Sequence, residues 1–254
     1  MSPDTGGAAG GSASGAGAVG DFVIAIDGPS GTGKSTVARR VAAALHAGYL
    51  DTGAIYRTAT LAVLRAGIDP DDAAAVAAVV TGLTLDPPVD PERQRHLFHG
   101  DDVSTELRGQ AVTTAVTPVS ANPAVRAHLL AVQQRLAHSG RMVVEGRDIG
   151  TVVAPDAALK IYLTADAHER ARRRLRQDEQ LAVVSTGVTG ANPDRAARLA
   201  AVASDLDRRD TSDSSRAVAP LQAAADAVLV DSSDLEPAET VRRVLGLAAE
   251  RGIR

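Results

Sequence analysis

Short, continuously apolar runs alternate along the chain with segments whose apolar residues recur every three or four positions. Four runs are candidates for buried strands: 22–26, 141–144, 159–163 and 227–230. Continuous hydrophobicity of this length is typical of strands covered on both faces of a parallel sheet. Because a helical pattern follows each run, their order is that of βαβ units. The pattern therefore predicts an α/β fold with a doubly wound parallel sheet.

The helical segments show apolar residues at helical spacing. The first runs from about residue 33 to 46, with Val37, Val41 and Leu45 at intervals of four, and it ends near Gly48. Further helices are predicted over 107–116, 123–137 and 237–249. The last of these begins with proline, whose missing N–H costs little at the start of a helix.

One stretch, 83–103, interrupts the alternation. It contains Pro87, Pro88 and Pro91, two Asp-rich turns and a short hairpin pattern around residues 96–98. Prolines at this density do not suit a central strand or the interior of a helix. We therefore expect an insertion at the edge of the sheet.

The composition favours one α/β domain stabilised by packing. Of the 254 residues, 44% are hydrophobic but only 2% are aromatic, so Ala, Val, Leu and Ile must build the core. The absence of cysteine excludes disulfides and thiolate metal sites. A formal net charge of -4 gives no general attraction to nucleic acid or anionic membranes, and no stretch approaches the roughly 20 apolar residues of a membrane span. We expect a cytoplasmic monomer whose partners are small molecules.

The first 20 residues differ from the rest of the chain. They consist mainly of Gly, Ala and Ser, contain no Lys or Arg, and lack the apolar core of a secretory signal. A segment of this composition has little to bury on folding. The sequence thus predicts a disordered leader over 1–20, followed by one domain over 21–254.

A phosphate-binding motif lies between the first strand and the first helix. It matches G-x-x-x-x-G-K-[ST] at every fixed position and consists, with the residue that follows, of Gly28, Pro29, Ser30, Gly31, Thr32, Gly33, Lys34, Ser35 and Thr36. In such a loop the backbone N–H groups surround phosphates, Lys34 reaches the β- and γ-phosphates, and Ser35 can ligate magnesium. A glycine-rich turn with a solvent-facing lysine would not require this order. The motif predicts binding of a nucleoside triphosphate, and leaves GTPases, motor ATPases and small-molecule kinases open.

Two clusters near strand ends could bind a phosphorylated acceptor. In 50–57 a turn opens a helix and brings Thr52, Tyr56 and Arg57 near one helical face. In 145–151 a carboxylate and a guanidinium leave the sheet at its carboxyl edge, where open α/β sheets bind ligands. The guanidinium there can hold a phosphate through two hydrogen bonds.

A third cluster, 208–221, holds three arginines and two aspartates and is predicted to be a loop. Each cluster also has a simpler interpretation. The first could be a helix cap with an exposed Arg57, the second a local salt bridge between Arg147 and Asp148, and the third a charged solvated linker. Composition and spacing leave these alternatives open.

Together, the matching segments resemble those of the bacterial cytidylate kinase family. They are 26–35, 50–57, 146–156 and 208–221, in family order between residues 22 and about 231. The resemblance implies an adenylate-kinase-like core, a nucleotide-binding insert over about 83–140 and a mobile lid over about 168–216. It also implies that ATP, with Mg²⁺, donates its γ-phosphoryl group to CMP or dCMP.

The resemblance implies roles for individual residues as well. Those that would bind the acceptor are Thr52, Tyr56, Arg57, Thr117, Arg126, Arg147, Asp148, Arg209, Asp213 and Arg216. Within this set Thr52 would touch the cytosine, and Arg209 and Asp213 would contact the sugar. Asp148 would either orient the magnesium shell or only pair with Arg147. The charges that would act on the transferring phosphoryl group are those of Lys34, Arg147, Arg173 and Arg216. Some members carry Ser at the position of Thr117 and Asp at that of Glu145.

Two other functions agree with the same motifs. A kinase of UMP or dTMP would need similar phosphate contacts, and a panel of monophosphates would distinguish it. A non-enzymatic P-loop switch would bind nucleotide and signal through a partner, but the chain has no Asn-Lys-x-Asp guanine-reading motif. Phosphoryl transfer needs positioning and charge more than a covalent nucleophile, so the predicted lysine, arginines and magnesium suffice.

Overall fold

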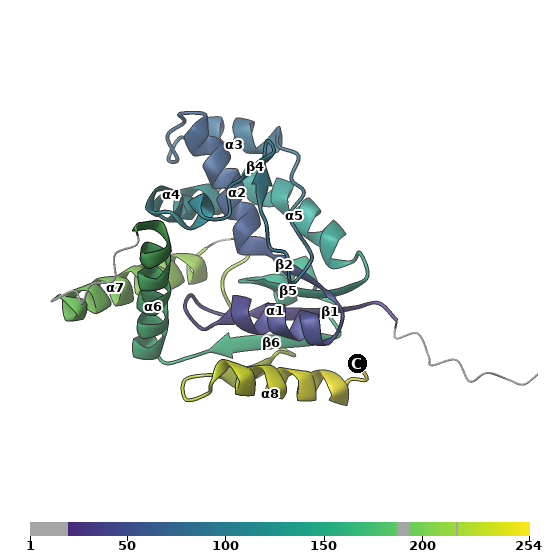
Figure 1. The fold of residues 1–254 in the computed structure, drawn as a ribbon. Helices are drawn as coiled ribbons and strands as arrows, with labels where there is room; N and C mark the ends of the chain where they lie inside the picture. Colours follow the sequence, from purple (N-terminus) through teal and green to yellow (C-terminus); the bar gives the residue numbers. More distant parts are fainter. Residues whose placement is uncertain (1–19, 187–193, 217) are drawn as a thin grey trace, which may run out of the picture.

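A five-stranded parallel sheet forms the centre of the computed structural model, which describes residues 20–186, 194–216 and 218–254 (Figure 1). The strands are β1 (Phe22–Asp27), β2 (Gly48–Asp51), β5 (Arg141–Gly146), β6 (Leu159–Thr164) and β7 (Val228–Asp231). Their order is β2-β5-β1-β6-β7 and every pairing is parallel, so all carboxyl ends meet at one edge. The predicted α/β fold and its four strands are confirmed. Strand β2, four residues beginning with glycine, was not predicted.

Helices cover both faces of this sheet (Figure 1). On one face α1 (Lys34–Ala44) and α8 (Pro237–Glu250) pack on Ile24 and Ile26 of β1. On the other, α2 (Thr52–Arg65) and α5 (Pro123–Ala137) cover Val23 and Ala25 of the same strand, and α3 (Ala73–Thr81) packs on these two helices. Successive residues of β1 therefore face opposite layers, which explains why Phe22 to Ile26 are all apolar. The predicted helices at 33–46, 123–137 and 237–249 are confirmed, whereas α3 was not predicted.

The region between α3 and α5 packs against the C-terminal half of α2. It contains an antiparallel hairpin of β3 (Leu97–Phe98) and β4 (Asp101–Asp102), a 3-10 turn at Glu106–Arg108, and α4 (Gln110–Ala121). A small core that includes Leu61, Phe98 and Val112 joins these pieces to α2. The hairpin expected around 96–98 is present. Helix α4 continues beyond the predicted end at Val116 and contains Pro118.

Two long helices stand at the carboxyl edge of the sheet. They are α6 (Ala167–Thr186) and α7 (Arg195–Ser214), and they pack against each other. The prediction of a loop over 208–221 is wrong for its first half, because residues 208–214 continue α7. Asp213 in this turn is only 9% exposed. Arg209, Asp210 and Asp213 of this segment have partners on other parts of the fold, so their polarity does not indicate a solvated loop.

Two further predictions concern the first 20 residues and membrane-spanning segments. The predicted leader over 1–20 lies outside the described residues, apart from Gly20. Among the helices in the described ranges, none is long and apolar enough to cross a membrane.

Candidate functional site

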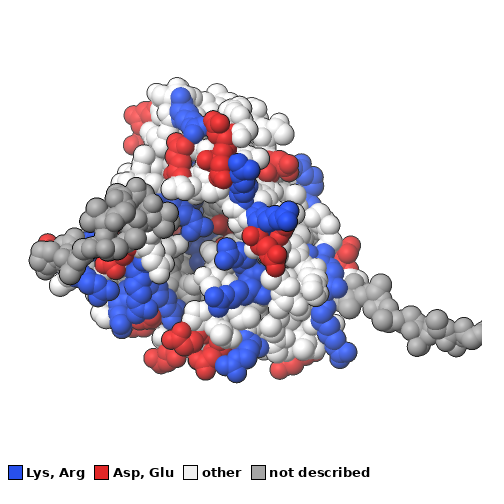
Figure 2. Space-filling model, in the orientation of Figure 1, with Lys and Arg blue, Asp and Glu red and all other residues white. Residues whose placement is uncertain are grey.

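A cavity of about 610 Å³ opens at the carboxyl edge of the sheet. Lysine and arginine side chains gather around this hollow (Figure 2). Its walls contain these residues from the sequence predictions: Ser30, Gly31, Thr32, Gly33, Lys34, Ser35, Thr36, Thr52, Tyr56, Arg57, Thr117, Arg126, Arg147, Asp148, Arg173, Arg209, Asp213 and Arg216. Gly28 and Pro29 of the motif are not among the residues that line the cavity. One cavity thus joins the triphosphate motif to all the candidate acceptor residues.

The phosphate-binding loop joins β1 to α1, as predicted. Lys34 is the first residue of α1 and is buried, and its Nζ donates to the carbonyl oxygen of Pro29 at 2.8 Å. Burial, with a smaller contribution from the positive charge of Arg147, lowers the pKa of Lys34 to about 7. A phosphate beside this ammonium would stabilise its charged form. The next residue, Ser35, is exposed toward the cavity.

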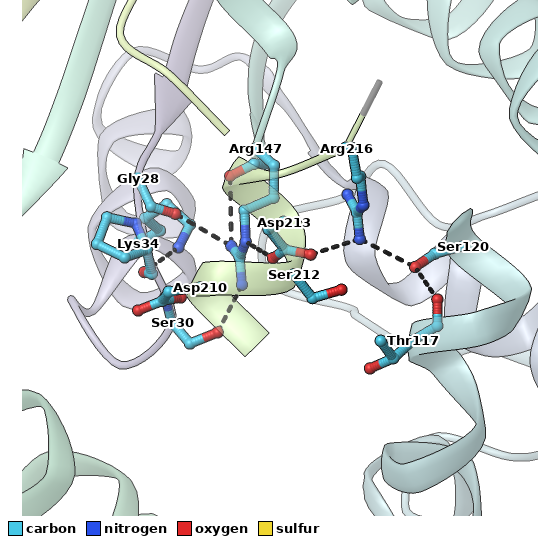
Figure 3. A network of polar contacts seen from close by, with 12 residues as sticks. Gly28, Ser30, Lys34, Thr117, Ser120, Arg147, Asp210, Ser212, Asp213 and Arg216 are labelled. Carbon is cyan, nitrogen blue, oxygen red and sulfur yellow. Dashed lines mark hydrogen bonds and ion pairs between the residues drawn. The ribbon is translucent and has the colours of Figure 1, made fainter. Parts of the chain in front are cut away.

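Arg147 connects the phosphate-binding loop to α7. Its Nη1 donates to the carbonyl oxygen of Gly28 at 3.1 Å and its Nη2 to Ser30 Oγ at 2.7 Å, while its Nε donates to Asp213 Oδ2 at 2.8 Å. The other carboxylate oxygen of Asp213 accepts from Arg216, which also donates to Ser120 Oγ of α4 at 3.1 Å. Figure 3 shows these side chains as a connected row. Two guanidinium groups that can bind phosphate are therefore held on either side of one carboxylate.

Asp148 pairs with Arg126 and not with Arg147. Both side chains are 9% exposed, and Nη2 of Arg126 donates to Asp148 Oδ2. The guanidinium carbon of Arg126 also lies 5.7 Å from the centre of the Tyr56 ring. Burial raises the pKa of Asp148, opposed chiefly by the charge of Arg126. The local Arg147–Asp148 salt bridge considered from the sequence is not formed.

Thr52 lies at the start of α2, where the chain turns from β2 into the helix. Asp51 caps this helix by accepting from the N–H of Ala54 at 2.9 Å, and Thr52 Oγ1 donates to the carbonyl oxygen of Glu145 at 2.7 Å. A Cβ at Gly146 would come within 2.6 Å of Thr52 Oγ1. Gly146 is therefore required for the close approach of α2 to β5.

Arginine side chains gather near Arg57, and one of them, Arg174, pairs with Asp178 of its own helix at 3.1 Å. The Arg57 side chain donates to the carbonyl oxygen of Leu107 at 3.3 Å, and Arg209 donates to the carbonyl oxygen of Thr113 at 3.1 Å. Burial lowers the pKa of Arg57 to about 10, and the positive charges of Arg174 and Arg209 add to this effect. A bound anion would relieve this repulsion. Arg174 was not singled out from the sequence, since nothing local distinguishes it from the arginines beside it.

Arg173, predicted to reach the transferring phosphoryl group, is held at the edge of the cavity. Its Nη2 donates to the carbonyl oxygen of Ser232 at 2.6 Å and its Nη1 to Ser232 Oγ at 3.0 Å. Its Nε donates to Glu169 Oε1 at 3.1 Å. These contacts tie α6 to the segment after β7.

The buried carboxylate of Glu145, to which the sequence analysis assigned no role, lies next to the phosphate-binding loop. Glu145 is the last residue but one of β5, the neighbour of β1, and accepts a hydrogen bond from Tyr49 of β2. Burial, with the nearby negative charge of Asp51, raises its pKa to about 7, and the Ser35 hydroxyl is also within hydrogen-bonding reach. The signal that could have identified Glu145 is an ionisable residue at the carboxyl end of an otherwise apolar strand.

Within the described ranges, no group of three or more His, Asp or Glu side chains could hold a metal ion alone. A magnesium ion here would therefore need phosphate oxygens and water as well as protein ligands. The exposed hydroxyl of Ser35 beside the Glu145 carboxylate fits such a site.

Comparisons with known proteins agree with this geometry. The family model described as cytidylate kinase matches residues 24–250. A cytidylate kinase of Nocardia farcinica is 53% identical over 91% of this chain and 94% of its own length. Cytidylate kinases of Rhodococcus opacus and Mycolicibacterium paratuberculosis are 52% and 50% identical over 91% of this chain and 96% of theirs. The chain belongs to the cytidylate kinase family.

Proposed function

We propose that this protein transfers the γ-phosphoryl group of ATP to CMP or dCMP, giving ADP and CDP or dCDP. The observation that carries the proposal is a single cavity with the phosphate-binding loop in one wall and the buried Arg126–Asp148 pair in another. Family membership supports a nucleoside monophosphate kinase over a non-enzymatic switch. The alternative acceptors UMP and dTMP are then distinguished by the base.

The donor end of the cavity is the loop Gly28–Thr36 and the start of α1. Lys34 would stabilise charge on the γ-phosphoryl group. Ser35 would ligate Mg²⁺, and Glu145 would orient water in its outer shell. When bound, magnesium neutralises part of the charge on the β- and γ-phosphates. The buried Glu145–Tyr49 contact keeps the carboxylate at the end of β5.

The acceptor end offers groups suited to cytosine. Cytosine presents an amino group at the position where uracil and thymine present a carbonyl oxygen. The carboxylate of Asp148 accepts a hydrogen bond from an amino group and repels a carbonyl oxygen. Arg126 holds this carboxylate, and Thr52 lies in the same wall of the cavity. Asp148 is thus proposed as a base-reading residue rather than a ligand of the magnesium shell.

The remaining polar groups would bind the sugar and phosphates. Arg57, Tyr56 and Arg126 would hold the acceptor phosphate or base, and Arg174 joins them because its charge acts on Arg57. The sugar would contact the residues Thr117, Arg209 and Asp213. The charges proposed to act on the transferring group are those of Lys34, Arg147, Arg173 and Arg216.

The kinase domain is proposed to span 21–254, with the acceptor-binding insert over about 83–140 and the lid over about 168–216. In this division α4, α5 and the β3–β4 hairpin belong to the insert, and α6 and α7 belong to the lid. The enzyme is proposed to act as a cytoplasmic monomer on free nucleotides.

The test is a steady-state assay of ADP release with ATP, Mg²⁺ and one monophosphate at a time. We expect CMP and dCMP to give the highest kcat/KM. Higher values for UMP or dTMP would contradict the assignment of the acceptor. Nucleotide binding without phosphoryl transfer to any monophosphate would favour the switch.

A further inference from the structure

Every polar group of Ser30 contacts a different element outside the phosphate-binding loop. Its backbone N–H donates to Asp210 Oδ1 of α7 at 3.0 Å, and its carbonyl oxygen accepts from Arg170 Nη1 of α6 at 3.1 Å. Its hydroxyl accepts from Arg147 at 2.7 Å. Figure 3 shows Asp210 beside Ser30 and close to Arg147. The third residue of the loop is thus the point where both long helices are attached.

Arg170 and Asp210 also pair with each other. Nη1 of Arg170 donates to Asp210 Oδ2, and the two side chains are only 14% and 15% exposed. Together with Ser30 they close a ring of three contacts, in which α6, α7 and the loop each bind the other two. Neither Arg170 nor Asp210 is among the residues that line the cavity. Their position therefore suits a role in holding the loop from outside rather than in binding nucleotide.

The approach of α6 to the loop is close. Gly31 has a φ of +81°, and a Cβ there would lie 2.9 Å from the carbonyl oxygen of Arg170 and 3.1 Å from its Cβ. Only glycine adopts this backbone conformation freely and leaves room for the backbone of α6. The contact thus depends on backbone packing as well as on the ion pair.

Asp213 lies three residues after Asp210, on the same face of α7. It is the carboxylate that holds Arg147 and Arg216 in the cavity. Fixing Asp210 against Ser30 therefore also fixes the position from which Asp213 reaches these two arginines.

We propose that Arg170 and Asp210 are a positioning pair that locks α6 and α7 onto the phosphate-binding loop at Ser30. This inference rests on the proposed kinase function. With the pair intact, Asp213 holds Arg147 and Arg216 where the phosphoryl group is transferred, and α6 and α7 close the cavity to water. Without it, the two helices separate from the loop, so transfer slows and more ATP is lost to water.

The test compares Asp210→Asn, Arg170→Gln and the double variant with the wild-type enzyme. For each we would measure kcat with CMP, the KM for ATP, and ATP hydrolysis without acceptor. Asn keeps an acceptor for the Ser30 N–H but removes the charge, so we expect kcat to fall about tenfold or more. The ratio of hydrolysis to transfer should rise several-fold. Because one contact is broken in all three, the double variant should be no slower than the slower single variant.

Two further variants separate this role from general stability. Asp205→Asn is the matched control, since Asp205 forms an exposed i,i+3 pair with Arg208 on the same helix at 2.6 Å. It should leave kcat and the hydrolysis ratio unchanged. Asp210→Glu keeps the charge and should recover part of kcat, while melting temperatures show whether each variant is folded.

Several results would overturn the proposal. Independent, multiplicative losses in the double variant would mean that the two residues do not act together. A lower melting temperature with an unchanged hydrolysis ratio would mean that the pair only contributes packing. A lower KM for ATP with faster turnover in Asp210→Asn would mean that the carboxylate competes with phosphate for the loop. If the wild-type enzyme prefers another monophosphate, the proposed acceptor is wrong, and the same ratios measured with that substrate still test the pair.

Discussion

Replacing Asp148 by Asn tests the proposed recognition of cytosine. The substitution keeps the size of the side chain and one oxygen acceptor, but removes the negative charge that faces Arg126. In the wild-type protein both groups are 9% exposed, so the solvent screens this pair poorly. Arg126 could still donate to the amide oxygen of the Asn, in place of the charged contact, and would keep its 3.4 Å hydrogen bond to the carbonyl oxygen of Ser120 and its position 5.7 Å from the centre of the Tyr56 ring.

The size of the effect follows from the charge that is lost. A hydrogen bond to a charged group contributes about 1.5–3 kcal/mol, which corresponds to roughly 10- to 150-fold in kcat/KM for CMP. An amide can turn its NH₂ group toward the carbonyl oxygen of uracil, so we expect a smaller loss for UMP. The ratio of kcat/KM for CMP to that for UMP should therefore fall by roughly tenfold or more.

The assay is steady-state kinetics with both monophosphates at saturating ATP, together with the melting temperature of the variant. A matched control is Asp156→Asn, since Asp156 is an exposed residue that pairs with His138 at 3.2 Å away from the cavity. Equal losses for CMP and UMP in Asp148→Asn would show that Asp148 supports the fold and does not read the base.

Three further predictions follow from the same contacts. Lys34→Ala should lower kcat on the order of 100-fold or more while the protein stays folded, since among the described residues the hydrogen bond of the ammonium goes to the carbonyl oxygen of Pro29; near wild-type turnover would refute this role. Asp213→Ala should raise the KM for CMP or lower kcat/KM by roughly 10- to 150-fold, with a smaller change in the KM for ATP; small and equal effects would remove Asp213 from the site. Asp27 positions the segment after Arg147 and Asp148 by accepting from the backbone N–H groups of Ile149 and Gly150 at 2.8 Å each, and burial raises its pKa to about 6. As the pH drops through 6 the carboxylate gains a proton and weakens these bonds, so kcat should fall; Asp27→Asn should lose this step, whereas a fall that starts near pH 7, where Glu145 titrates, should remain. A step near pH 6 that persists in Asp27→Asn would contradict this role of Asp27.

The parts of the fold that the sequence predicted are those whose signal is local. Strand β1 is apolar from Phe22 to Ile26 because it is covered on both faces, and the phosphate-binding motif follows the strand directly. The glycines and Lys34 of that motif are needed at fixed spacing, so the pattern alone identified the loop. The helix at 123–137 likewise begins at Asn122 and Pro123, which are local start signals.

The parts that were missed depend on partners distant in the sequence. The end of α7 is highly charged, and nothing local shows that Asp210 meets Ser30 and Arg170, or that Asp213 meets Arg147. Strand β2 is short and gains its place by pairing with β5, which follows it by about 90 residues. Arg126 was placed through the family resemblance, while its partner Asp148 was assigned to a different arginine. A single sequence gives the residue types of such pairs but not the pairing.

The central claim is that cytidine monophosphates are the acceptors, and a competition assay tests it most directly. The wild-type enzyme would receive CMP, dCMP, UMP and dTMP at equal concentrations with Mg²⁺ and a limiting amount of ATP, and the diphosphates formed would be separated and measured. A carboxylate held by Arg126 at the acceptor end of the cavity predicts that CDP and dCDP account for nearly all of the product. A product pool dominated by UDP or dTDP would contradict the account.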